Sequence, residues 1–198
     1  MDVLNNTVFL WLNASAHPAP WIVDLAVVLA DWAIWLIPLT LCAGWLYGNE
    51  NSRRTMLMAA VAGGLGLFAN QIIGMMWMHP RPFMVGLGHT LITHAPDSSF
   101  PSDHLTLWWA VAFSLLASSR LRRLGGVLAV SGIPVAWSRI YLGVHFPLDM
   151  AGAAAVAAIC AWGVRFEAHW YLIPLYNLAQ ALHQRLFRGL IKRGWVAP

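Results

Sequence analysis

The sequence predicts an all-α integral membrane protein, a helical bundle with five or six transmembrane helices. Of its 198 residues, 59% are apolar and only 10% are charged, whereas a soluble domain carries about 25% charged residues. Apolar runs of roughly 20 residues, the length that crosses a hydrocarbon core, recur along the chain. Because these runs fill most of the chain, we expect residues 1–198 to form one membrane domain.

Five apolar runs are predicted to be spanning helices, and small groups of arginine separate them. A sixth segment, residues 169–190, mixes apolar side chains with Gln, His and Arg. This amphipathic pattern favours a helix on the membrane surface, with a sixth span as the alternative. The five runs are residues 21–47, 55–77, 104–119, 124–142 and 146–164.

The arginines also predict the orientation, because cytoplasmic loops are enriched in Lys and Arg. Groups of arginine follow the first, third and fifth runs, at residues 53–54, 120–123 and 165. We therefore expect the N-terminal segment and the long connection at 78–103 on the outer side. The formal charge of +4 is distributed over these small groups rather than along one polar face, so we expect no nucleic-acid partner.

Three short polar stretches on the predicted outer side are the candidate functional site. Each contains an arginine or a histidine, and an arginine fork is suited to bidentate recognition of phosphate. We therefore predict a phosphate ligand. The stretches are Arg81-Pro82, Pro101-Ser102-Asp103-His104, and Ser138-Arg139 followed by His145 and Asp149.

The spacing of these residues predicts their chemical roles. Asp149 follows His145 by four positions, so its carboxylate can fix the imidazole tautomer and leave the other ring nitrogen free to attack. His104 can then protonate the leaving oxygen. Ser102 stands at the start of the third run, where an N-cap and free backbone N–H groups can help to hold an anion.

The three stretches, in this order, resemble the signature motifs of the type 2 phosphatidic acid phosphatases, relatives of vanadium haloperoxidases. The resemblance covers about residues 74–149, and its third motif, Ser-Arg-x5-His-x3-Asp, is strongly specific. It implies that His145 is the nucleophile, with Asp149 as its partner and His104 as the general acid. It also implies that Arg81, Ser102 and Arg139 bind phosphate.

Two positions depart from the family pattern. Gly74 stands where the first motif has a lysine, and His79 is one candidate to replace that ligand. Asp103 stands where many members have glycine. Because a carboxylate repels a phosphate dianion, we expect Asp103 either to turn away from the phosphate or to pair with a cation such as Arg81 or Arg139, and pairing is the simplest hypothesis. Both departures resemble the bacterial branch associated with bacitracin resistance, which acts on undecaprenyl diphosphate.

The resemblance therefore implies hydrolysis of undecaprenyl diphosphate to undecaprenyl phosphate at the periplasmic face of a bacterial inner membrane. No metal cluster is visible in the sequence, and no cofactor is expected. The alternatives are a lipid phosphatase acting on phosphatidate or phosphatidylglycerophosphate, and a non-enzymatic lipid-binding or transport protein. Lipid tail, phosphate number and oligomeric state have no signature in the sequence.

Other polar residues are predicted to have no catalytic role. Asp24 and Asp31 lie in the first run, where carboxylates are costly and often functional, but we expect packing or polar satisfaction within the bundle. The remaining histidines are expected to be loop or interface residues. They are His17, His89, His94, His169 and His183.

Overall fold

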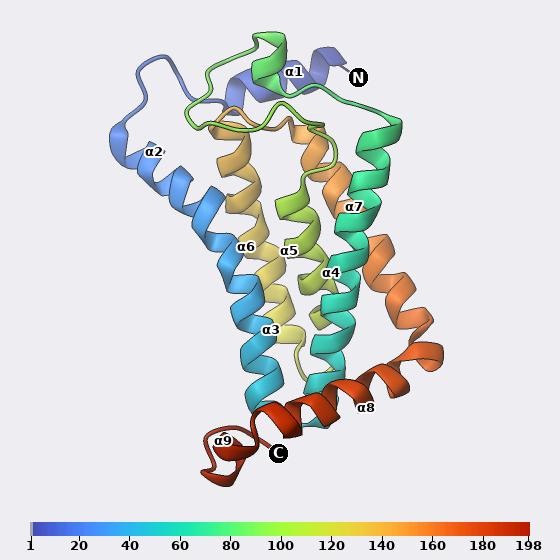
Figure 1. The fold of residues 1–198 in the computed structure, drawn as a ribbon. Helices are drawn as coiled ribbons and strands as arrows, with labels where there is room; N and C mark the ends of the chain where they lie inside the picture. The colour runs from blue at the N-terminus through green and yellow to red at the C-terminus, as the bar shows by residue number, and fades with distance from the viewer. Residues whose placement is uncertain (1) are drawn as a thin grey trace.

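The computed structural model describes residues 2–198, and its regular elements are all helices (Figure 1). Long helices run side by side, with α1 at one end of the bundle and α8 across the other. All five predicted runs are helical. The elements are α1 (Asp2–Leu12), α2 (Pro20–Val27), α3 (Leu36–Tyr47), α4 (Glu50–Met76), α5 (Asp103–Leu116), α6 (Arg122–Tyr141), α7 (Pro147–Phe166), α8 (Ala168–Leu186) and α9 (Arg188–Lys192), with a short turn of helix at Pro82–Val85.

Four of the described helical stretches are long and apolar enough to cross a membrane. They are Pro20–Tyr47, α4, α6 and α7, with 28, 27, 20 and 20 residues. The chain is therefore a multi-pass membrane protein. The third predicted run is the exception in length, because α5 has only 14 residues and rises only about 21 Å at 1.5 Å per residue.

Helix α5 forms the centre of the bundle and packs against α4, α6 and α7. It is buried on several faces, through residues such as Leu105, Trp108 and Leu115. The indole of Trp108 donates to the carbonyl oxygen of Leu128 on α6 at 2.6 Å. A helix apolar all round is expected in such a central position, and it brings the start of α5 to the middle of one end of the bundle.

The amphipathic segment predicted at 169–190 forms α8 and α9, and neither is among the four long apolar helices. Figure 1 shows α8 lying across the end of the bundle. The buried Arg53 at the start of α4 anchors it, since its guanidinium donates to Gln180 Oε1 at 2.9 Å and lies 3.2 Å from His183 Nε2. The predicted amphipathic helix is therefore present, and its place on the membrane surface stays a prediction.

The first long helix is not regular along its length. Between α2 and α3 it contains a π-helical turn, Val28–Trp32, and a 3-10 turn, Ala33–Trp35. Such π turns often occur at functional sites. This one contains Asp31 and packs against α6, so the irregular turn brings an intramembrane carboxylate to the helix that carries Arg139.

Helix α1 ties together two loops at its end of the bundle. The side-chain oxygen of Asn5 accepts from the N–H of Leu148, in the first turn of α7, at 3.1 Å. The amide of Asn13 donates to the carbonyls of Tyr141 at 3.0 Å and His89 at 2.9 Å. Asn5 on α1 and Asn13 directly after this helix therefore fix the end of α6, the start of α7 and the connection between α4 and α5.

Candidate active site

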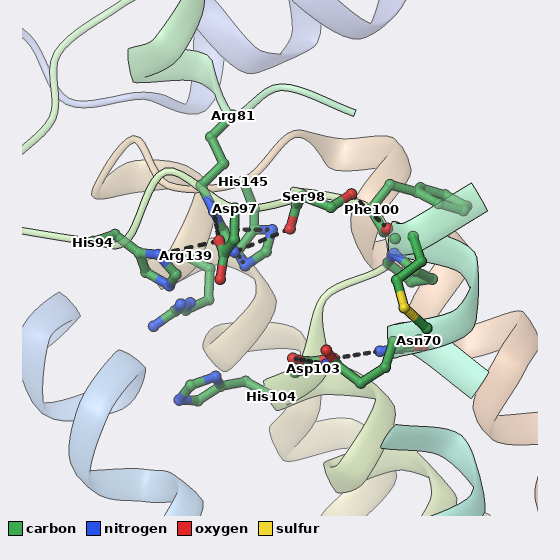
Figure 2. A pocket seen from close by; sticks show the side chains of 14 residues that line it. Asn70, Arg81, His94, Asp97, Ser98, Phe100, Asp103, His104, Arg139 and His145 are labelled. Carbon is green, nitrogen blue, oxygen red and sulfur yellow. Dashed lines mark hydrogen bonds and ion pairs between the residues drawn. The ribbon is translucent and has the colours of Figure 1, made fainter. Parts of the chain in front are cut away.

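A cavity of about 310 Å³ opens at the end of the bundle near α1. It lies between α4, the start of α5, the end of α6 and the connection at 78–102. Figure 2 shows Arg81 and His145 on one side of it and His104 on the other. The lining residues are Asn70, Gln71, Gly74, Met75, Arg81, His94, Asp97, Ser98, Phe100, Pro101, Asp103, His104, Arg139 and His145.

The imidazole of His145 is almost fully buried and is held through Nδ1. This atom lies 2.9 Å from the carbonyl oxygen of Ser99 and 3.2 Å from Oδ2 of Asp149. Because both neighbours are acceptors, Nδ1 carries the ring proton and Nε2 keeps its lone pair. NH1 of Arg81 lies 3.1 Å from Nε2 and donates to it. The ring is thus set in the tautomer that a nucleophile requires.

Asp149 is completely buried and has two further donors besides His145. The hydroxyl of Ser99 donates to its Oδ2, and the N–H of Phe146 donates to the same atom at 2.7 Å. Pro147 occupies the first position of α7, as expected for a helix start. The carboxylate therefore caps α7 and orients the imidazole at once.

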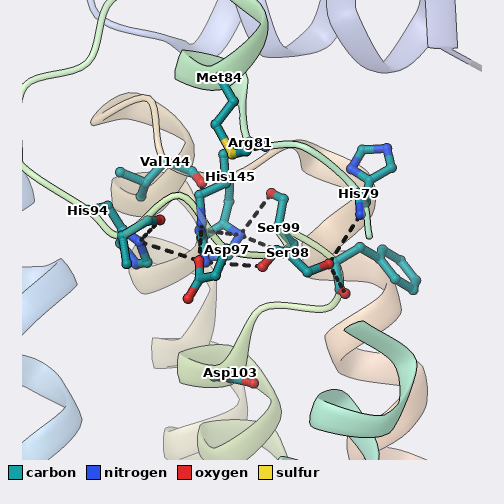
Figure 3. A network of polar contacts seen from close by, with 12 residues as sticks. His79, Arg81, Met84, His94, Asp97, Ser98, Ser99, Asp103, Val144 and His145 are labelled. Atoms are coloured by element: carbon teal, nitrogen blue, oxygen red, sulfur yellow. Dashed lines mark hydrogen bonds and ion pairs between the residues drawn. The ribbon is translucent and has the colours of Figure 1, made fainter. Parts of the chain in front are cut away.

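The guanidinium of Arg81 is fixed by acceptors on three sides (Figure 3). Its Nε donates to Oδ1 of Asp97 at 2.8 Å, NH1 donates to the carbonyl of Val144 at 2.9 Å, and NH2 donates to the carbonyl of Ser98 at 3.2 Å. A carboxylate and two loop carbonyls thus hold this cation against His145.

Arg139 is buried on α6 with most of its hydrogen-bonding capacity unused. Its NH1 lies 3.5 Å from Oδ1 of Asp31, whereas Nε and NH2 are buried and have no hydrogen-bond partner among residues 2–198. A buried guanidinium without acceptors is unfavourable. Because Arg139 also lines the cavity, an anion in the cavity would supply the missing acceptors.

Comparison with known proteins agrees with this geometry. Residues 54–173 match the PAP2 superfamily. The chain belongs to this superfamily. It is 35% identical to YbjG of Escherichia coli strain K12 over 99% of this chain and 98% of that protein. It is also 34% identical to the undecaprenyl-diphosphatase BcrC of Bacillus subtilis strain 168, over 96% of this chain and 97% of that protein.

A solved PAP2 structure has the same fold. The PAP2-type phosphatidylglycerolphosphate phosphatase of Bacillus subtilis aligns with a TM-score of 0.65 at 18% identity. The alignment covers 86% of this chain and 87% of that one. The all-α bundle is therefore the bundle of the PAP2 fold.

The structure brings four of the six predicted PAP2 site residues to the cavity wall: Arg81, His104, Arg139 and His145. Asp149 lies behind His145. Ser102 is also fully buried and is not among the lining residues. It occupies the N-cap position of α5, but its side chain makes no capping hydrogen bond and its hydroxyl has no partner.

The expectation that Asp103 pairs with an arginine is wrong. Its Oδ1 accepts from the amide of Asn70 at 2.8 Å, and its Oδ2 lies 3.4 Å from the amide nitrogen of Gln71. Asp103 begins α5 and faces α4, whose side chains at this level are neutral. The arginines find their carboxylates elsewhere, Arg81 in Asp97 and Arg139 in Asp31.

Gly74, which stands at the position of the motif lysine, lines the cavity beside the loop at 97–99. A Cβ atom at this position would lie 3.2 Å from Cβ of Ser98, so the loop packs closely against the glycine. His79 does not replace the lysine. It is not among the lining residues, and its ring packs against those of Trp77 and Phe146.

Sequence reasoning missed three residues in the long connection. His94 lies in the predicted loop, but it also lines the cavity, and its ring centroid lies 6.2 Å from that of His145. Burial lowers the pKa of His94, and the charges of Arg81 and Arg139 add to this effect. Asp97 accepts a hydrogen bond from Arg81, and the hydroxyl of Ser99 donates to Asp149. The only available signal was the concentration of polar residues in this connection.

Within residues 2–198, no group of three His, Cys, Asp or Glu side chains is arranged to hold a metal ion. The described side chains that line the cavity include two arginines, three histidines, the amides of Asn70 and Gln71, and the separate carboxylates of Asp97 and Asp103. Fixed cations of this kind can stabilise the charge on a transferring phosphoryl group.

The loss of activity at low pH should follow the protonation of His145. Burial lowers the pKa of its imidazole from 6.5 to about 4, although the hydrogen bond to Asp149 raises it. Because the neutral ring of His145 is the predicted nucleophile, kcat/KM should stay high down to about pH 5 and be lost as the pH falls through about 4. Initial rates on two substrates whose phosphates titrate differently provide the check. If activity on both substrates were instead lost as the pH falls through about 6.5, the assignment to His145 would be contradicted.

Proposed function

We propose that the protein hydrolyses undecaprenyl diphosphate to undecaprenyl phosphate and inorganic phosphate through a phosphohistidine. The observation that carries the proposal is the buried Nε2 of His145, which keeps its lone pair beside the guanidinium of Arg81. A nucleophile next to a fixed cation is suited to attack on an anionic phosphoryl group.

In the first step, Nε2 of His145 attacks the terminal phosphorus in line with the bridging oxygen. The N–P bond forms, the bond from phosphorus to the bridging oxygen breaks, and the electron pair leaves on the lipid phosphate. The negative charge of the bound diphosphate favours the protonated form of His104, which donates a proton to that oxygen. Arg139 and Arg81 neutralise the equatorial oxygens of the phosphoryl group. Asp149 stabilises the positive charge that develops on the ring.

In the second step, a water molecule attacks the phosphohistidine. His104, now neutral, accepts a proton from this water as the N–P bond breaks. Inorganic phosphate leaves, and His145 returns to its neutral tautomer. Ser99 and Asp149 keep the ring in place through both steps, so the same Nε2 serves as nucleophile and leaving group.

The choice of a lipid diphosphate rests on the relatives. BcrC, which is named as an undecaprenyl-diphosphatase, matches this chain over nearly its full length. The chemistry points the same way, because the leaving group from a diphosphate is a phosphate rather than a poorer alkoxide. A broader lipid phosphatase and a non-enzymatic lipid-binding protein remain the alternatives to be tested.

The test compares phosphate release by the purified protein, with EDTA present, from undecaprenyl diphosphate, phosphatidate and phosphatidylglycerophosphate. We expect kcat/KM to be at least about tenfold higher on the diphosphate. Farnesyl diphosphate and farnesyl phosphate form a matched pair that differs only in phosphate number. Equal rates on this pair and on all three lipids would indicate a broader phosphatase. No release above that of a His145→Gln variant would indicate a binding protein.

We further propose that the cavity faces the periplasm of a bacterial inner membrane and that α5 is a fifth, short span. The arginines at the α8 end support this orientation, because such residues mark the cytoplasmic side. Cysteines placed at Gly88 and Lys192, with Cys42 and Cys160 replaced, provide the test. An impermeant thiol reagent should label only position 88 in intact cells, and labelling at 192 would contradict the proposal.

A further inference from the structure

A second cavity, of about 470 Å³, lies at the end of the bundle opposite the active site. It is bounded by the start of α4, the turn between α5 and α6, the end of α7, and α8. Arg54, Arg120 and Arg165 line it, each from a different part of the chain. Residues more than 100 positions apart thus place three positive charges around one hollow.

Few carboxylates form ion pairs with these three arginines. Arg54 pairs with Glu50 at 2.5 Å, one turn away on α4, and its Nε is buried without a partner. Arg120 and Arg165 form no ion pair with any described residue, since neither occurs in an ion pair within 2–198. The cavity therefore has an excess of positive charge, which favours an anionic occupant.

The rest of the lining suits a molecule that is polar at one end and apolar at the other. Ser118 and Ser119 offer hydroxyl groups beside Arg120, whereas Met58 and Leu172 provide apolar surface. Leu172 belongs to α8, the amphipathic helix that lies across this end of the bundle (Figure 1). A helix of this type lies at the level of lipid headgroups, so the cavity opens where phospholipid phosphates are found.

We infer that this cavity binds the headgroup phosphate of an anionic phospholipid. The three arginines contact the phosphate oxygens, the serine hydroxyls donate to them, and the acyl chains leave along Met58 and Leu172. Basic hollows at the cytoplasmic ends of membrane helices bind acidic headgroups in this way. Since the site is remote from His145, the inference does not depend on the proposed hydrolysis.

The test measures lipid binding by native mass spectrometry on the delipidated full-length protein. Phosphatidylglycerol is titrated against phosphatidylcholine, whose cationic choline three arginines would disfavour. The test variant is Arg120→Gln with Arg165→Gln. The matched control is Arg122→Gln with Arg123→Gln, which removes the same charge from exposed residues at the start of α6 that do not line the cavity.

We expect Arg120→Gln/Arg165→Gln to weaken phosphatidylglycerol binding at least about tenfold, and the control pair to change it less than about twofold. Phosphatidylcholine should bind the wild type more weakly. If both double variants lost phosphatidylglycerol binding equally, the effect would come from net charge alone, and the inference would be overturned. Inorganic phosphate alone should bind the wild type more weakly than phosphatidylglycerol, and equal affinity would overturn the inference because free phosphate would then be the ligand. Circular dichroism confirms that both variants fold.

Discussion

Replacing His145 with alanine is expected to lower kcat by at least about 10⁴-fold, because removing a nucleophile leaves only binding and charge stabilisation. The variant should also lose the acid-labile phosphoenzyme. Nε2 of His145 is the atom that Arg81 faces, and the opposite nitrogen, Nδ1, is held by Asp149 and by the carbonyl of Ser99. Quenched-flow trapping of radiolabelled phosphate on the protein, together with steady-state rates, measures both effects.

His169→Ala serves as the control, since this histidine lies exposed on α8 at the far end of the bundle and should leave kcat unchanged. His145→Gln keeps a polar side chain in the buried position and guards against loss of folding. If His145→Ala still hydrolysed lipid at the parental rate with a trapped phosphoenzyme, the nucleophile would have to be another residue.

Replacing Arg139 with glutamine is expected to lower kcat by about 10²–10³-fold, the usual effect of removing one donor to a developing oxyanion. Arg139→Lys should recover only part of this loss, because an ammonium cannot replace the guanidinium fork. The buried Nε and NH2 of Arg139 have no protein acceptor, which leaves them available to the phosphoryl group. Steady-state kinetics on all variants measure the effect.

Asp31 should matter only through Arg139. We expect Asp31→Asn to lower kcat about tenfold, and Asp31→Asn combined with Arg139→Gln to be no worse than Arg139→Gln alone, because coupled residues are not additive. Asp24→Asn is the matched control, a carboxylate on the same helix that is exposed and outside the ion pairs. Additive losses in the double variant would show that Asp31 acts independently of Arg139.

The bundle could be predicted from the sequence because membrane helices depend on local composition. The five runs of apolar residues predicted the helical segments of the bundle. The mixed pattern at 169–190 predicted the amphipathic helix that lies across its end. The break at Val28–Trp32 could not be predicted, since it reflects packing of the first helix against α6. Its consequence, the contact between Asp31 and Arg139, was invisible for the same reason.

The site could be predicted where the spacing of two residues along the chain determines whether their side chains meet. The positions of His145 and Asp149 predicted their contact, which the structure contains at 3.2 Å. Asp97 and Ser99 belong to a connection without periodicity, so nothing in the sequence distinguished them from their neighbours. The prediction for Asp103 was wrong because it considered only a cation as partner, whereas the amides of Asn70 and Gln71 on α4 face the carboxylate.

The contacts of α1 bear on how the protein is assembled during synthesis. Asn5 and Asn13 are made long before their partners Leu148 and Tyr141, so these contacts can form only after the end of α6 and the start of α7 have been made. The loop that carries His145 is fastened only then. A chain that ends before α7 would therefore lack both Asp149 and the contacts that fasten the loop of His145, so the proposed catalytic centre can form only once the start of α7 is present.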